Sequence, residues 1–147
     1  MIAREGCAMP EKFEFIEHTA DLGFRAYAVS IEELFVHAAE AFFETILSSE
    51  SVEERIERTI EVEAGALDEL MVSWLDEFLY LYDTEKLVFK RFQIKQIRQN
   101  GLEAKAWGEI MDPARHEIKR GIKAVTYHKL YVKEIEGRWE AQVILDI

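Results

Sequence analysis

The sequence has little of what redox chemistry, cysteine-based metal sites and membrane insertion require. It contains a single cysteine, Cys7, among 147 residues, so the chain cannot close an internal disulfide or build a zinc finger. No apolar stretch approaches the roughly 20 residues that cross a bilayer, and residues 1–11 contain no signal-peptide core. These absences exclude redox and zinc-finger classes, and they predict a soluble, cytoplasmic protein without a membrane partner.

The common signatures of nucleotide binding and hydrolysis are also missing. The chain has no G-x-x-x-x-G-K-[ST] phosphate loop, no G-x-G-x-x-G, no G-x-S-x-G and no H-E-x-x-H. Its 29 acidic and 18 basic side chains give a formal net charge of -11, which would repel a phosphate backbone. Tight, direct binding of nucleic acid is therefore not expected. Such acidity suits cations or a basic partner surface, but it also occurs where charge simply keeps a surface solvated.

The length and the apolar content of the chain favour one domain with one sizeable core. Residues 1–11 lack periodicity and include Pro10, so they are predicted to form a flexible N-terminal extension. Residues 12–147 are predicted to form the folded domain.

Hydrophobic periodicity predicts two helices among about seven strands. The first helix is expected from Ile31 to Ser48, because Ser30 and Glu33 form a capping box before an apolar stripe. The second is expected from about Asp68 to Tyr82. Strands are expected at residues 13–17, 23–29, 56–63, 87–97, 102–110, 124–135 and 138–145, with turns at Asn100-Gly101 and Glu136-Gly137. This order predicts an α+β domain with a mainly antiparallel sheet and two helices packed on it.

Two acidic groups lie at the end of the sequence. If Glu136-Gly137 is a two-residue turn, Ile135 faces Arg138, and counting along the ladder places Tyr127 and His128 opposite Asp146 and Leu145. Pairing of this kind would hold Asp146 and the α-carboxylate of Ile147 in place, within one residue of each other. Like charges at that separation need a compensating cation, or one of them must protonate.

Asp21 is the candidate third carboxylate, in the link His18-Thr19-Ala20-Asp21 between the first two strands. Oxygens from Asp21, Asp146 and Ile147 would suit a hard divalent cation, and Ca²⁺ tolerates irregular geometry better than Mg²⁺. Mg²⁺ and Mn²⁺ are the alternatives. Alternatively, Asp21 is a turn residue that caps nearby amides.

The four histidines are weaker signals. His18 adjoins the proposed site and would either support it or remain a neutral, hydrogen-bonded side chain. His128 would lie near the chain end only if the predicted register holds, because a slip of one residue turns it to the other face. His37 is expected on the surface, and His116 is interpreted as a polar loop residue.

Six ordered motifs resemble those of the archease family. They are Glu17-His18-Thr19-Ala20-Asp21-Leu22-Gly23, Ser30-Ile31-Glu32-Glu33-Leu34-Phe35, Trp74-Leu75-Asp76-Glu77-Phe78-Leu79-Tyr80, Leu87-Val88-Phe89, Lys123-Ala124-Val125-Thr126-Tyr127-His128 and Leu145-Asp146-Ile147. The resemblance runs from about Phe13 to Ile147. It implies an α+β fold and a bound divalent cation, with family ligands that correspond to Asp21, Asp146 and the carboxylate of Ile147.

The resemblance also implies a function. Members of that family are accessory proteins of RtcB-type RNA ligase, and they promote guanylylation and multiple turnover of the ligase in tRNA splicing and RNA repair. The chain would then assist chemistry performed elsewhere, and would not itself be an enzyme. Two other hypotheses stay open: a stand-alone metal-dependent phosphohydrolase that uses the same carboxylates, and a chaperone-like binding module that needs neither Asp21 nor a metal.

Overall fold

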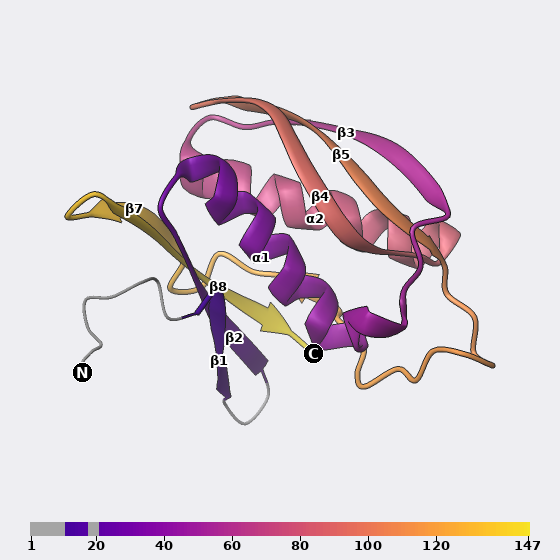
Figure 1. Ribbon diagram of the computed structural model, residues 1–147. Helices are drawn as coiled ribbons and strands as arrows, with labels where there is room; N and C mark the ends of the chain where they lie inside the picture. Colours follow the sequence, from indigo (N-terminus) through magenta and orange to yellow (C-terminus); the bar gives the residue numbers. More distant parts are fainter. Residues whose placement is uncertain (1–10, 18–20) are drawn as a thin grey trace.

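Two antiparallel sheets enclose two α-helices in the computed structural model, which describes residues 11–17 and 21–147 (Figure 1). The first sheet has the order β1-β2-β8-β6, and β7 also pairs with β8. Its strands are β1 (Phe13–Glu17), β2 (Asp21–Ala28), β6 (Ala124–Val125), β7 (Tyr131–Ile135) and β8 (Arg138–Asp146). The second sheet has the order β3-β5-β4, with β3 (Ile56–Glu63), β4 (Leu87–Arg98) and β5 (Gly101–Ile110). The helices are α1 (Ile31–Ile46) and α2 (Leu67–Glu85), and the 3-10 helix η1 (Ser49–Ser51) follows α1.

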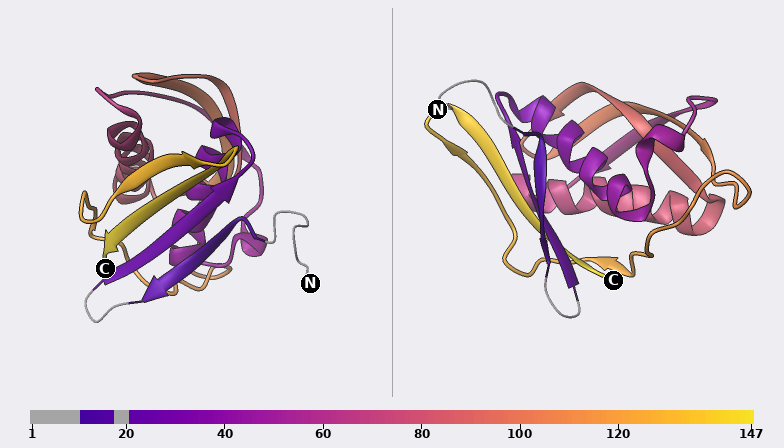
Figure 2. Two further views of the ribbon diagram at one scale, coloured as in Figure 1. Left: turned by 90° about the vertical axis from the view of Figure 1, so that its left-hand side faces the viewer. Right: turned by 60° about the horizontal axis from the view of Figure 1, so that its bottom comes forward.

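The predicted α+β class is confirmed, with both helices and the antiparallel strands in one domain. The division of the strands into two sheets is an addition to that prediction. Helix α1 packs against β2 of the first sheet and β4 of the second, and α2 packs against β3, β4, β6 and β7. The helices therefore form a middle layer that supports both sheets (Figures 1 and 2).

The amino end of α1 is set by its cap. The Ser30 hydroxyl accepts a hydrogen bond from the Glu33 N–H at 3.1 Å, which satisfies an amide that the helix itself leaves unpaired. The helix ends at Ile46, two residues before the predicted end, because Leu47 has an extended backbone. Its phenylalanines join those of α2 and β4 in one core, where Phe43 contacts Phe78 and Phe89 edge to face.

Strands β2 and β8 are paired along their whole length, from Asp21 opposite Asp146 to Ala28 opposite Trp139. Leu22 and Leu145 are buried in the sheet face toward the helices. Because side chains alternate between faces along a strand, Asp21 and Asp146 belong to the outer face. Figure 2 shows the end of β8 beside the start of β2.

The predicted strand at residues 124–135 is wrong as a single element. The turn at Glu136-Gly137 does place Ile135 opposite Arg138, but pairing stops at Tyr131 and resumes only at Val125. Asp146 consequently faces Ala124 and not Tyr127. The reason is a bulge of the kind that adds residues to one strand only: Lys129 has a left-handed backbone (φ 52°), and the Leu130 N–H donates to the Tyr127 carbonyl at 3.3 Å.

Two smaller boundaries also differ from the prediction. Asp21 is the first residue of β2 and does not belong to the link before it. The turn between β4 and β5 is formed by Gln99 and Asn100, because Arg98 already pairs with Gly101.

The structure also bears on membrane insertion. Across residues 11–17 and 21–147, no helix is both long enough and apolar enough to span a bilayer.

Candidate functional site

The first and last residues of two paired strands bring two predicted site residues together. Asp21 begins β2, Asp146 ends β8, and the two are register partners. Side chains of directly opposed residues share one face, with their Cβ atoms about 5 Å apart. The structure thus places two carboxylates side by side at one end of the five-stranded sheet.

The Asp21 side chain contains an unusual atom. Its Oδ1 is shielded from solvent and has no hydrogen-bond partner within residues 11–17 and 21–147. A buried polar atom without a partner costs roughly 1–3 kcal/mol, and more if it carries charge. A cation held between Asp21 and Asp146 would remove this cost, so the donor atoms fit a hard divalent metal.

The end of β8 is held firmly from the side opposite β2. The Lys123 N–H donates to the Asp146 carbonyl at 2.7 Å, and the Thr126 hydroxyl donates to the Ile144 carbonyl at 2.8 Å. The Ile147 side chain packs against the hydrophobic core. The backbone at Asp146 is therefore fixed by pairing on both sides, and Ile147 is held by core packing.

A metal at this position would need donors beyond aspartate side chains. The described part of the chain contains no group of three or more His, Cys, Asp or Glu side chains that could hold a metal ion. Asp21 and Asp146 supply two side-chain carboxylates here, and the carboxylate of Ile147 stays the predicted third donor. Since Ca²⁺ takes about six to eight oxygen ligands, the remaining positions would be filled by water or by another molecule.

The two predicted supporting histidines have different outcomes. His18 lies outside the described residues. His128 lies in the bulge between β6 and β7, where its N–H donates to the Thr126 hydroxyl at 3.2 Å and its side chain is exposed. The bulge overturns the register that placed His128 opposite Leu145, since Val125 occupies that position.

Further along β2 and β8 from the two aspartates, the outer face of the five-stranded sheet carries a hydrogen-bonded network. The Tyr27 hydroxyl donates to Glu14, the Tyr131 hydroxyl donates to Glu140, and the Arg25 Nε donates to Gln142 at 3.0 Å. Burial, together with the hydrogen bond to Glu140, raises the pKa of Tyr131 to about 12. Burial and the hydrogen bond to Glu14 also raise the pKa of Tyr27. Both phenols consequently remain protonated donors at neutral pH, and the network is intact there.

His116 lies in a loop as the sequence suggested, but it is not a polar surface residue. Its side chain is buried, and its Nδ1 accepts a hydrogen bond from the Asp112 N–H at 2.9 Å. The ring proton therefore lies on Nε2, which is 3.0 Å from Oε2 of buried Glu109 and 3.1 Å from the Ser51 carbonyl. Nothing in the local sequence distinguishes such a histidine, because Glu109, Ser51 and His116 meet only in the folded chain.

The group around Glu109 fixes the loop that leads to the candidate site. Glu109 also accepts hydrogen bonds from the Arg115 guanidinium and, at 2.8 Å, from the Glu53 N–H. These contacts join the end of β5 and the segment after η1 to residues 112–116. The same loop then continues to Lys123, whose N–H is bonded to Asp146.

Replacing Glu109 by glutamine should lower the free energy of unfolding by about 3 kcal/mol at pH 7, because it leaves Arg115 and the buried His116 without their anionic partner. Burial alone would raise the pKa of Glu109, but the hydrogen bonds from Glu53, Arg115 and His116 outweigh it and hold the pKa below its ordinary value. The native state thus favours the ionised form. That stability is present above the unfolded-state pKa of about 4.3 and is lost as pH falls through the lower folded-state pKa.

Urea unfolding of wild type and Glu109→Gln between pH 3 and pH 8 measures this difference. The difference in free energy of unfolding between the two proteins should be largest near neutral pH and should shrink in acid. Glu103→Gln is the control, since Glu103 is exposed on the same strand. A gap that stays constant down to pH 3 would show that the charge of Glu109 does not contribute.

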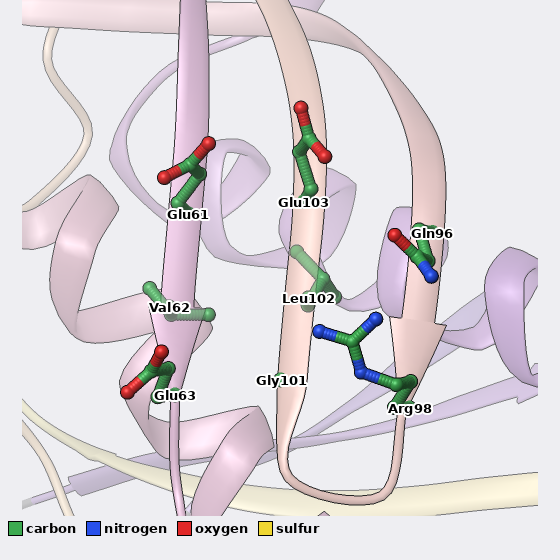
Figure 3. Close-up of a pocket in the computed structure, with 8 residues that line it drawn as sticks. All are labelled: Glu61, Val62, Glu63, Gln96, Arg98, Gly101, Leu102 and Glu103. Atoms are coloured by element: carbon green, nitrogen blue, oxygen red, sulfur yellow. The ribbon is translucent and has the colours of Figure 1, made fainter.

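A second acidic region lies on the other sheet and is separate from the candidate site. A hollow of about 200 Å³ is lined by Glu61, Glu63, Glu103, Arg98 and neighbouring residues. Figure 3 shows the glutamates of β3 and β5 with Arg98 of β4 beside them. The glutamates of this hollow do not form a group that could hold a metal ion, and no such group occurs in the described part of the chain.

Comparison with known proteins gives consistent matches along the chain. Residues 13–147 match the model of the Archease protein family (MTH1598/TM1083). Protein archease of Pyrococcus furiosus is 43% identical over 140 residues, which cover 92% of this chain and 99% of that protein. Protein archease of Methanosarcina mazei is 40% identical over 141 residues, which cover 93% of this chain and 97% of that protein.

Two solved structures share the fold. The solution structure of Methanobacterium thermoautotrophicum protein 1598 matches with a TM-score of 0.81 and 37% identity, covering 92% of this chain and 99% of that one. The Thermotoga maritima protein described as an archease, possible chaperone, matches with a TM-score of 0.60 and 21% identity. That match covers 90% of this chain and 94% of the other. At such low identity, the second likeness speaks to the fold alone.

Proposed function

Because this chain belongs to the archease family, we propose that it is an accessory protein of an RtcB-type RNA ligase. It promotes guanylylation of the ligase and its multiple turnover in tRNA splicing and RNA repair, and it is not itself an enzyme. The absence of phosphate-loop and nucleophile motifs supports an assisting role.

The observation that carries the proposal is the buried Oδ1 of Asp21 beside Asp146, which has no hydrogen-bond partner among residues 11–17 and 21–147. Asp21, Asp146 and the α-carboxylate of Ile147 would hold a divalent cation, with Ca²⁺ the best match to these oxygen donors and Mg²⁺ or Mn²⁺ as alternatives. Such a cation supplies positive charge that orients phosphate oxygens.

The residues of this chain have positioning tasks in the proposed role. Pairing with β2 and β6 fixes the direction of β8, so Asp146 stays next to Asp21. Three acidic groups fill only part of the coordination shell of a calcium ion. The remaining positions are open to oxygen atoms of the ligase or of its nucleotide, which would place the candidate site against the ligase active site.

The overall charge fits a protein partner better than RNA. A formal net charge of -11 repels the phosphate backbone, whereas an RNA ligase needs a basic surface to hold its substrate. We therefore propose that this chain reaches RNA only through the ligase.

A ligase turnover assay tests the function. Purified chain is added to an RtcB-type ligase with GTP and RNA ends. In one arm a divalent cation that this chain binds is present. In the other arm that cation is removed by a chelator, and a cation that supports only the ligase is then added. The proposal is supported if the chain stimulates the ligase only when the chain has its cation bound. Hydrolysis of a phosphomonoester by this chain without ligase would favour the phosphohydrolase. A chaperone-like module would be favoured if the chain stimulated the ligase equally with and without the bound cation and also promoted the refolding of unrelated proteins.

A further inference from the structure

The bulge between β6 and β7 presents the most exposed large aromatic or aliphatic side chain of the described residues. Tyr127 has 63% of its surface accessible to solvent. It belongs to residues 126–130, which we call the Tyr127 loop, and His128 beside it is also exposed. Exposed tyrosines are common on protein surfaces. The contacts that hold the backbone around Tyr127 therefore carry the argument for a role.

The Tyr127 loop is held at several points along its short length. At its start, the Thr126 N–H and hydroxyl both donate to the Ile144 carbonyl, at 3.1 and 2.8 Å. The Thr126 hydroxyl also accepts from the His128 N–H, and the Leu130 N–H donates to the Tyr127 carbonyl. These bonds fix the backbone on both sides of Tyr127.

A chain of side chains across the outer face of the sheet holds the other end of the loop. Gln142 of β8 donates from Nε2 to the Lys129 carbonyl at 2.9 Å. Its Oε1 accepts from the Arg25 Nε, so the amide can point its nitrogen only toward the loop. The Arg25 Nη1 in turn lies 3.9 Å from the Glu14 Oε2 of β1, which makes an ion pair. The sheet thus contributes three strands to the placement of one exposed loop.

The loop also holds an unfavourable backbone. Lys129 has φ 52°, a left-handed conformation that is unfavourable for residues other than glycine. Such strain persists where the surrounding contacts over-determine it. Here the contacts hold the left-handed backbone at Lys129 in a loop that leaves Tyr127 exposed.

We propose that Tyr127 is an anchor by which this chain docks on the ligase, and that the Tyr127 loop is a preformed docking element. The inference rests on the proposed function. The occupant is identified by continuity with the candidate site: the loop is bonded to Ile144, two residues before Asp146 on the same strand. A ligase that supplies oxygen atoms beside Asp21 and Asp146 therefore lies within reach of Tyr127. Its surface would offer an apolar pocket for the ring and a hydrogen-bond partner for the hydroxyl.

Binding measurements with matched variants test the proposal. The affinity of the ligase is measured for the wild type, Tyr127→Ala and Tyr80→Ala, and Ca²⁺ affinity is measured for each chain alone. Tyr80 is the control, because it is 60% exposed on α2. Tyr127→Ala should weaken ligase binding about 30-fold, as expected for a central interface tyrosine, and leave Ca²⁺ affinity unchanged. Tyr80→Ala should change neither measurement.

Gln142→Leu tests whether the loop is preformed. This variant keeps Tyr127 but frees Lys129, so ligase binding should weaken by about three- to tenfold through the added cost of ordering the loop. Binding by Gln142→Leu equal to wild type would overturn the preformed loop.

The remaining outcomes separate this inference from the proposed function. Wild-type chain that binds the ligase while Tyr127→Ala binds within threefold would overturn the anchor and leave the function intact. Loss of Ca²⁺ affinity in Tyr127→Ala would overturn it too, because the loop would then be part of the cation site. Failure of the wild type to bind the ligase would overturn both.

Discussion

Replacing Asp21 by asparagine is expected to remove the stabilisation of this protein by Ca²⁺ and its stimulation of the ligase. Asparagine preserves the size of the side chain but offers one neutral oxygen in place of a carboxylate, so a hard cation loses a charged ligand. The buried Oδ1 of Asp21 has no hydrogen-bond partner among the described residues. Its removal therefore breaks no contact that the structure assigns to that atom.

Thermal unfolding with and without Ca²⁺ measures the effect. A cation at about 100 times its dissociation constant should stabilise the wild type by about 2.7 kcal/mol, and the Asp21→Asn variant should gain almost nothing at that concentration. Without the cation the variant should be at least as stable as the wild type, because it removes one of two opposed carboxylates. Ligase stimulation should fall about 100-fold or more in the same variant, as when an essential charge contact is lost.

Asp83→Asn is the matched control, since Asp83 is exposed on α2. It should retain both Ca²⁺ stabilisation and ligase stimulation. Stabilisation of Asp21→Asn equal to that of the wild type would show that the cation binds elsewhere. A chain extended beyond Ile147 tests whether the Ile147 carboxylate is the third donor, because the extension converts this carboxylate into a peptide carbonyl. Equal Ca²⁺ affinity in the extended chain would remove Ile147 from the site.

The convergence of Asp21 and Asp146 was only partly predictable from sequence. Hairpin turn chemistry at Glu136-Gly137 correctly placed Ile135 opposite Arg138. It could not show that β2 would pair with the other side of β8, since these strands are separated by more than a hundred residues. Family resemblance proposed that Asp21 and Asp146 act together, and the register supplies the proximity such action needs. Whether they bind a metal stays a prediction.

The errors have a common physical origin in contacts between distant segments. Periodicity continued from Ala124 to Ile135, but Gln142 and Ile144 of β8 hold residues 126–130 out of the ladder. His116 looked like a polar residue in a charged loop, yet Glu109 and Ser51 accept its Nε2 proton in the interior. Local patterns predict elements well because one segment determines them. The bulge and the buried histidine depend on partners that only the fold brings together.

The largest loss of stability is expected for Gly108→Ala, because the central strand β5 has no room for a side chain at this position. A Cβ on Gly108 would lie 1.9 Å from the Val88 carbonyl oxygen and 2.6 Å from the Phe89 Cα. Both atoms belong to the backbone of β4, which crosses here next to a register shift between Phe89 and Arg91. β4 can retreat only by breaking its ladder and withdrawing the buried Phe89 from Phe43 and Phe78.

The free energy of unfolding of Gly108→Ala should therefore fall by at least about 4 kcal/mol, which is comparable to the whole stability of a small domain. Urea unfolding measures it, and low solubility on expression is the expected accompaniment. Gly121→Ala is the matched control, because a Cβ there meets nothing within 4 Å. That variant should remain within about 1 kcal/mol of the wild type, with any gain coming from a stiffer unfolded chain. A Gly108→Ala protein as stable as Gly121→Ala would mean that β4 does not pass over Gly108, and the register of the three-stranded sheet would then be wrong.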